Sequence, residues 1–251
     1  MLYYFLTTAF PEVHTKSLPE MSFQELSDLL LESLSEKDQE AYRDFLLYID
    51  LKNIKAFLLG KPLDPRGFLS QKELREALLR REGLPDYLFE FFDRFEGKKE
   101  QVLRYASVYA QFFSENRTGF LGKYFGFVRS MRLVLTALRA QRWHRNLDEE
   151  LQFEPIDSSL PAYILAQKGA KDFEPPEEFA DLKTLFVAHE EAPMDFEKKL
   201  LEYQIKKIEE LEEGRLFQID QVLAFAAKLL LVESWHNLDQ EKGKAALDQL
   251  I

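Results

Sequence analysis

Apolar positions recur at helical spacing along most of the chain, and the segment 195–213 shows the pattern most clearly. Its apolar residues are Phe196, Leu200, Leu201, Tyr203, Ile205, Ile208 and Leu211. Residues three or four apart share one face of a helix, so this spacing predicts an amphipathic helix that Gly214 would end. Similar patterns predict helices at about 22–34, 37–60, 70–82, 85–96, 98–115, 120–145, 159–168 and 218–237. The first ten residues fit either a short strand or a helix.

Two of these helices carry a recognisable start signal. Ser22 stands three residues before Glu25, and Ser70 stands three residues before Glu73. In such a capping box the hydroxyl accepts a hydrogen bond from a first-turn N–H, and the glutamate accepts one from the N–H of the serine. The sequence therefore predicts helix starts at Ser22 and Ser70.

The chain contains 10 Gly and 10 Pro, which lie mostly between the periodic segments. An all-β chain needs turn residues at shorter and more regular spacing. Proline is concentrated within 146–194, so this segment is predicted to be the least regular, a long connection with short helices. No flexible linker is evident. We expect an all-α fold in a single domain, 1–251.

A faint internal repeat accompanies the helical pattern. Three segments each carry a polar pair three residues apart: Phe45–Ile54 with Asp50 and Asn53, Tyr124–Leu133 with Arg129 and Arg132, and Lys228–Asn237 with Glu233 and His236. Each pair would form one polar spot on a helix beside a buried stripe. Any amphipathic helix offers such pairs, so coincidence stays open beside a true repeat. The approximate repeat units would be 1–95, 96–194 and 195–251.

Charge and composition exclude several classes of function. The 33 Lys and Arg against 44 Asp and Glu give a net charge of -11, which disfavours binding to nucleic acid. Cysteine is absent, which excludes disulfides and thiolate metal sites and favours a reducing, intracellular compartment. The apolar start Met1–Phe10 lacks the basic region of a secretory signal. No apolar run reaches the roughly 20 residues of a membrane span.

One segment reverses the charge of the chain. Between Leu121 and Leu147 there is no Asp or Glu, and six cations are present: Lys123, Arg129, Arg132, Arg139, Arg142 and Arg145. On a helix, Arg129, Arg132, Arg139 and Arg142 fall within an arc of roughly 140° among apolar positions. These arginines either pair with the chain's own carboxylates or bind an acidic partner protein or a phospholipid headgroup. They are the candidate partner-binding residues.

Candidate catalytic groups are few. No two of the four histidines have the i, i+4 spacing of zinc ligands, and the glycines around Lys123 lack the spacing of a phosphate-binding loop. Acidic runs such as 148–150 are typical of solvated faces. We therefore expect no catalytic residue, no metal and no cofactor, although an enzyme that acts through a carboxylate pair stays a third hypothesis.

Several short motifs carry a resemblance to a known family. The stretch Tyr48–Lys61 with Gly67–Ser70, and the stretch Phe217–Asn237, resemble the C-type subunit of V-type ATP synthases, which in vacuolar ATPases is the d-type subunit. The matching motif residues are Asp50, Asn53, Lys55, Glu233 and Asn237; His236 holds the position expected for the last Asn. Tyr3–Leu6, Arg132–Ala140 and Val232–Trp235 resemble a bacterial family encoded alongside V-type ATP synthase subunits.

The resemblance implies a function as well as a fold. It implies three similar helical units arranged as a funnel that couples the membrane rotor ring to the central stalk of a V-type ATPase. Such a protein would be cytoplasmic and peripheral on the cytoplasmic face of the membrane, held there by its partners, with no active site and no small-molecule substrate. The arginines would be candidates for the stalk interface. The alternative from composition alone is a soluble α-helical adaptor unrelated to the ATPase.

Overall fold

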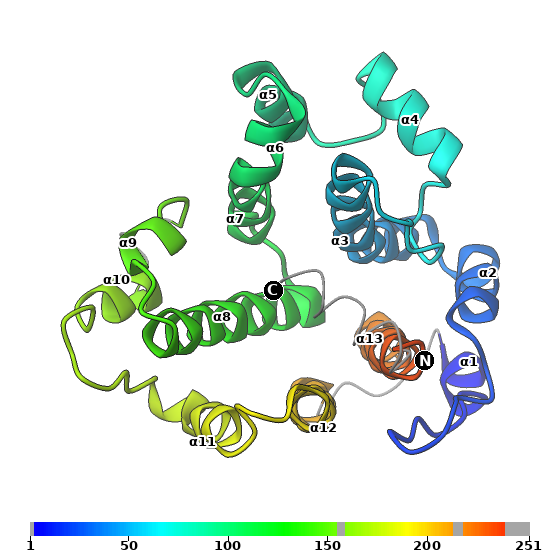
Figure 1. Cartoon of the computed structure of the whole chain (residues 1–251). Coiled ribbons are helices and arrows are strands. Elements are labelled where there is room, and N and C mark those ends of the chain that lie inside the picture. Colours follow the sequence, from blue (N-terminus) through cyan, green and yellow to red (C-terminus); the bar gives the residue numbers. More distant parts are fainter. Residues whose placement is uncertain (1–2, 155–158, 213–217, 239–251) are drawn as a thin grey trace. The chain divides into compact units, whose positions relative to one another are not determined.

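The computed structural model describes residues 3–154, 159–212 and 218–238, and the regular structure in these ranges is entirely helical (Figure 1). The all-α prediction is confirmed. Within the described ranges the elements are α1 (Tyr4–Thr8), α2 (Phe23–Ser33), α3 (Glu36–Leu59), α4 (Gln71–Arg80), α5 (Asp86–Arg94), α6 (Lys98–Arg104), α7 (Ala106–Ser114), α8 (Gly119–Arg142), α9 (Leu147–Glu150), α10 (Ser159–Leu165), the 3-10 helix η1 (Glu177–Phe179), α11 (Ala180–Ala188), α12 (Pro193–Glu212) and α13 (Ile219–His236).

Both predicted capping boxes are present. The Ser22 hydroxyl accepts a hydrogen bond from the N–H of Glu25 at 3.2 Å, and the Glu25 carboxylate accepts one from the N–H of Ser22 at 2.8 Å. Ser70 and Glu73 repeat the arrangement at the start of α4, at 3.3 and 2.9 Å. The helix starts predicted at these serines are therefore confirmed, and the start of the chain is helical in α1.

The predicted helix 98–115 is interrupted, and this is a correction. It is divided at Tyr105 into α6 and α7. The Tyr105 side chain is fully buried, and its hydroxyl donates a hydrogen bond to the carbonyl oxygen of Leu51 at 2.8 Å. The irregular segment 146–194 contains short helices as expected. The helix end predicted at Gly214 lies outside the described residues.

The chain divides into two compact units, each built from segments far apart in the sequence. Unit 1 comprises 1–35, 119–124 and 174–251, and unit 2 comprises 36–118 and 125–173. The helix α8 therefore begins in unit 1 and continues in unit 2. These boundaries differ from those of the predicted repeats, and the single domain and the three-unit funnel stay predictions.

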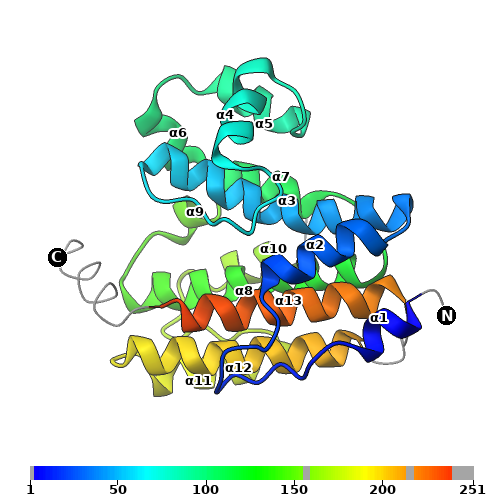
Figure 2. The ribbon, with the colours of Figure 1, turned by 90° about the vertical axis from the view of Figure 1, so that its right-hand side faces the viewer.

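In unit 1, α12 and α13 lie side by side (Figures 1 and 2), and α13 also packs against α2. Leu201 and Ile205 of α12 form a buried cluster with Val232 of α13, because the apolar face of the amphipathic α12 turns toward its neighbour. The rings of Phe10 and Phe225 stack with centroids 4.1 Å apart. The N-terminal segment is thereby fixed to α13.

In unit 2, α3 packs against α6 and α7, and much of the core is aromatic. The ring centroids of Tyr48 and Phe112 lie 5.6 Å apart, and those of Phe112 and Phe125 lie 4.9 Å apart. The guanidinium of Arg117 covers the face of Phe112 at 4.0 Å and pairs with Asp44 at 2.6 Å. Aromatic packing of this kind joins α3, α7 and α8 within the unit.

Candidate functional site

Two of the four candidate arginines meet a carboxylate of their own chain. The Nε and Nη2 atoms of Arg129 donate hydrogen bonds to the Glu154 carboxylate at 3.1 and 2.9 Å, and Nη2 of Arg132 donates to its other oxygen. The Glu154 side chain is only 5% exposed. A carboxylate so far removed from water requires such partners. The internal pairing that the sequence left open is therefore present for Arg129 and Arg132.

Lys55 brings a further positive charge to this place. It projects from α3, is half-buried, and lies over the ring of Tyr109 with its Nζ 5.8 Å from the ring centroid. Burial lowers the pKa of the Lys55 ammonium, and the charges of Arg132 and Lys61 lower it further. We call Lys55, Arg129, Arg132 and Glu154 the basic cluster.

The basic cluster carries more positive than negative charge. It has three cations and one carboxylate: Arg129 and Arg132 pair with Glu154, whereas Lys55 makes no ion pair with a described residue. The Nε atom of Arg132 is buried and lacks a hydrogen-bond partner within the described ranges. An anion from outside the chain would lower the electrostatic energy of this arrangement.

The remaining candidate arginines lie further along α8. Arg139 follows Arg132 by seven residues, which places it about two turns away on the same face of the helix. It is partly exposed and forms no ion pair with any residue that the structure describes. Arg142 is exposed at the end of the helix. Their predicted role in partner binding stays a prediction.

Asp50 and Asn53, two of the motif residues of α3, hold a turn. Asp50 is 2% exposed and accepts a hydrogen bond from the N–H of Leu69 at 3.2 Å. Burial raises the pKa of the Asp50 carboxyl to about 7, although backbone N–H groups of Leu69 and Phe68 oppose the rise. A Cβ on Gly67 would collide with the Asp50 carboxylate. The turn therefore passes directly over this carboxyl group.

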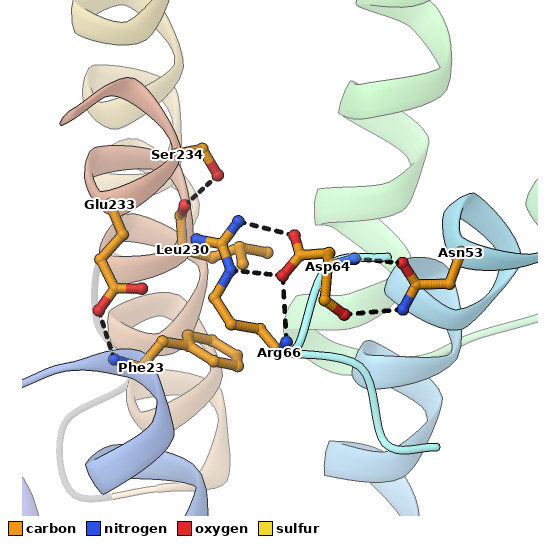
Figure 3. Close-up of polar contacts among 7 residues, drawn as sticks. All are labelled: Phe23, Asn53, Asp64, Arg66, Leu230, Glu233 and Ser234. Carbon is orange, nitrogen blue, oxygen red and sulfur yellow. Dashed lines mark hydrogen bonds and ion pairs between the residues drawn. The ribbon is translucent and has the colours of Figure 1, made fainter. Parts of the chain in front are cut away.

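Asn53 holds the beginning of the same turn (Figure 3). Its side-chain amide donates to the carbonyl oxygen of Asp64 at 2.9 Å and accepts from the N–H of Asp64 at 2.7 Å. The Asp64 carboxylate in turn pairs with Arg66 at 2.7 Å. Asn53 therefore binds backbone groups of its own unit, and these hydrogen bonds explain why a polar side chain is buried here without a ligand.

The C-terminal motif residue Glu233 serves a helix start. Its carboxylate accepts a hydrogen bond from the N–H of Phe23, the first residue of α2, at 2.6 Å (Figure 3). Asp220, which the sequence pattern did not single out, acts in the same way on α8 by accepting from the N–H of Phe120 at 2.9 Å. Carboxylates are favourable at these positions because N–H groups at the start of a helix need acceptors. Asn237 is exposed and ends α13.

The described residues form neither a metal site nor a membrane span. No group of three or more His, Asp or Glu side chains among them is placed to hold a metal ion. None of the described helices combines the length and apolar character that crossing a membrane requires.

Comparison with known proteins places the chain among uncharacterised relatives. Residues 1–251 match the model of the family described as "Protein of unknown function (DUF2764)". An "Uncharacterized protein" of Chlamydia muridarum is 26% identical over 256 residues, which cover 98% of this chain and 96% of the relative. A Chlamydia pneumoniae relative is 27% identical over 257 residues, covering 99% and 97%. No solved structure matches the chain.

These findings correct the resemblance stated above. The family model that spans the chain is not that of the C-type subunit of V-type ATP synthases, and neither relative carries the name of such a protein. The expected membership of that family, in the form of the bacterial proteins encoded with V-type ATP synthase subunits, is wrong. Asp50, Asn53 and Glu233 make local hydrogen bonds that many helical proteins can use, so short motifs of this kind identify a family poorly. The coupling role that the resemblance implied stays an untested prediction.

Proposed function

The chain belongs to the family described as "Protein of unknown function (DUF2764)", and we propose that it is a helical adaptor whose unit 2 binds an acidic segment of a partner protein. The proposal is supported by one observation, the excess of positive charge at the basic cluster. Two of its three cations, Arg129 and Arg132, pair with the single carboxylate of Glu154, and Lys55 adds a third positive charge, although the chain as a whole has a net charge of -11.

A short acidic segment fits this charge distribution better than a long polyanion does. Nucleic acid or an anionic membrane would extend beyond the cluster and meet the acidic remainder of the chain. A short segment with a few Asp or Glu side chains can contact the basic cluster and Arg139 without reaching the acidic remainder of the chain. The carboxylates would pair with Lys55 and Arg139, which have no acidic partner in the described part of the chain.

Binding of this kind predicts a proton linkage at Lys55. Burial and neighbouring cations lower the pKa of its ammonium in the free protein. A carboxylate placed beside it would raise that pKa again, so the bound form holds the proton more tightly. Affinity for an acidic segment therefore weakens as the pH rises through the range in which Lys55 of the free protein loses its proton.

A fluorescein-labelled peptide of ten glutamates provides a direct test. Fluorescence anisotropy at low salt should show binding that Lys55→Glu and Arg139→Glu each weaken about tenfold, and that added salt also weakens. The matched control is Lys99→Glu on α6, an exposed lysine of the same unit. Absence of binding at low salt, or an equal loss in the control, would contradict the proposal.

Two charge reversals on α8 separate folding from binding. Arg132→Glu would place a second carboxylate against the buried Glu154, so it should lower the melting temperature. Arg139→Glu faces no such group and should leave the melting temperature unchanged while it weakens peptide binding. Equal destabilisation by both variants would mean that Arg139 also serves the fold.

The proposal includes a location in the cytoplasm, peripheral on the cytoplasmic face of the membrane through partner proteins. The absence of cysteine supports a reducing compartment. Cell fractionation with a high-salt wash tests this, because an adaptor held by charge pairs should move from the membrane fraction to the supernatant. Recovery in an oxidising, extracytoplasmic fraction would refute it.

A further inference from the structure

A second basic site lies at the C-terminal end of α8, entirely within unit 2. Here the structure has an open pocket of about 450 Å³. The volume lies in the usual range of small-molecule sites. We call it the α8 pocket. It is lined by residues of two segments, 140–147 and 167–173.

The charged groups that line the α8 pocket are all cationic. They are Arg145, Lys168 and Lys171, joined by the imidazole of His144. Lys168 and Arg145 pair with Asp148 and Glu150, at 3.1 and 3.5 Å, but neither acid lines the pocket. These pairs are exposed and therefore weak, so both cations can turn to a bound anion at small cost.

The pocket is built by specific contacts between its two segments. The side-chain oxygen of Gln141 accepts a hydrogen bond from the N–H of Phe173 at 2.7 Å, and its amide donates to the carbonyl oxygen of Ala170 at 3.4 Å. The Phe173 ring is 2% exposed and anchors the second segment. Lys168 and Lys171 are thereby held opposite the end of α8.

His144 occupies a backbone position that favours glycine. The N–H of Arg145 donates to the carbonyl oxygen of Ala140 at 2.7 Å, and that of His144 to Gln141 at 3.3 Å, which together form a Schellman helix end. His144 is the left-handed residue of this motif, with φ of 54°. Its side chain makes no hydrogen bond within the described ranges, so the fold does not explain why an imidazole is present at this strained position.

We propose that the α8 pocket binds a small organic phosphate. Arg145, Lys168 and Lys171 would pair with the phosphate oxygens, and His144 would donate a further hydrogen bond. Several cations around one site suit a group with two negative charges better than a single carboxylate. The walls also include Leu147, Ala170 and Phe173, and the volume exceeds that of a free phosphate, so the rest of the ligand carries apolar surface. This inference does not depend on the adaptor proposal.

Phenyl phosphate, inorganic phosphate and benzoate are suitable probes for isothermal titration calorimetry. We expect phenyl phosphate to bind the full-length protein most tightly, because it alone combines a dianion with an apolar ring. Lys171→Ala should weaken its binding at least tenfold, whereas Lys99→Ala should leave it unchanged. Tighter binding of benzoate than of phenyl phosphate would contradict the proposal and indicate a carboxylate ligand. Absence of heat with all three probes at millimolar concentration would refute the site.

His144→Gly separates binding from stability. Relief of the left-handed strain should raise the melting temperature of the free protein, yet loss of the imidazole should weaken phenyl phosphate binding about tenfold. Arg81→Gly is the matched control, since Arg81 is left-handed as well, with φ of 58°, and lies outside the pocket. Unchanged binding in His144→Gly would overturn the role of the imidazole. Lys55→Glu, which tests the adaptor proposal, should not affect this probe.

Discussion

At the scale of single residues, three carboxylates of this protein fix backbone segments by accepting hydrogen bonds from N–H groups. Asp50, Asp220 and Glu233 each accept a hydrogen bond from a backbone N–H of a segment remote in sequence or across a turn. Two of them are buried, where an acceptor without a donor would be costly. Substitution at these positions should therefore affect stability before it affects any binding function.

Asp50 gives a prediction about pH. Its pKa is about 7 in the folded protein against 3.8 for an ordinary aspartate, so the folded state binds this proton more tightly than the unfolded state. The resulting stabilisation is complete below about pH 4 and is lost as the pH rises through about 7. Asp50→Asn should remove this loss, which is at most about 4 kcal/mol. Urea titrations of both proteins between about pH 4 and pH 8 measure the difference, and parallel pH profiles would contradict the assignment.

Two glycines of α8 form a matched pair. Gly119 has a φ of 65°, and a Cβ there would come within 2.8 Å of the Asp220 carboxylate, so Gly119→Ala should destabilise the protein by about 2 kcal/mol or more. A Cβ on Gly126 would meet nothing within 4 Å. Gly126→Ala should instead stabilise the helix by up to about 1 kcal/mol. Thermal denaturation measures both, and a loss of similar size in the two variants would show that alanine is harmful for another reason.

At the scale of elements, the start of α2 is stabilised from two sides. The hydroxyl of Ser22, the residue just before the helix, accepts a hydrogen bond from the N–H of Glu25, and the Glu233 carboxylate of α13 accepts one from the N–H of Phe23. The contribution of Ser22 was predictable, because a capping box is recognised from four consecutive residues. The contribution of Glu233 depends on packing between segments 210 residues apart, which no local pattern reveals.

This double arrangement predicts graded losses. Ser22→Ala should cost about 1 kcal/mol. Glu233→Ala should cost about 1–3 kcal/mol, since the N–H of Phe23 loses its acceptor, and Glu233→Gln should cost less because an acceptor oxygen is kept. Chemical denaturation gives the energies, and hydrogen exchange of the first-turn amides of α2 shows where the loss occurs. Equal losses for the Gln and Ala variants would mean that the charge, and not the acceptor, is what matters.

Other elements differ in how far the sequence predicts them. The helices from α2 to α5, α8, α12 and α13 follow hydrophobic spacing and were predicted within a few residues. The break at Tyr105 was not predicted, and the hydrogen bond that its hydroxyl donates to α3 joins segments whose contact no local pattern reveals. Glu154 was also missed, because it lies in the irregular segment, where spacing carries no information about which charges meet. The arginines were found, but their partner was not.

At the scale of the whole molecule, the chain passes between the two units more than once. Unit 1 draws on three separate segments and unit 2 on two. Such an arrangement depends on contacts between distant segments, whereas the sequence pattern records only near neighbours. The single domain with three approximate repeat units stays a prediction. Each unit has its own buried residues, for example Leu30 of α2 in unit 1 and Leu46 of α3 in unit 2.

The division into units predicts a pattern of local stability. Leu30→Ala and Leu46→Ala should each cost about 2–5 kcal/mol, as buried leucines do. Hydrogen exchange read by mass spectrometry should show faster exchange mainly in unit 1 for the first variant and mainly in unit 2 for the second. Uniform acceleration over both units in either variant would mean that the two parts unfold together.

The two carboxylates of α13 also have a consequence for biosynthesis. Asp220 and Glu233 supply acceptors to the starts of α8 and α2, yet both are made after those helices have left the ribosome. Every segment of unit 2 has by then been translated. Unit 2 can therefore begin to fold on the nascent chain, whereas α2 lacks its contacts with α13 until that helix has emerged.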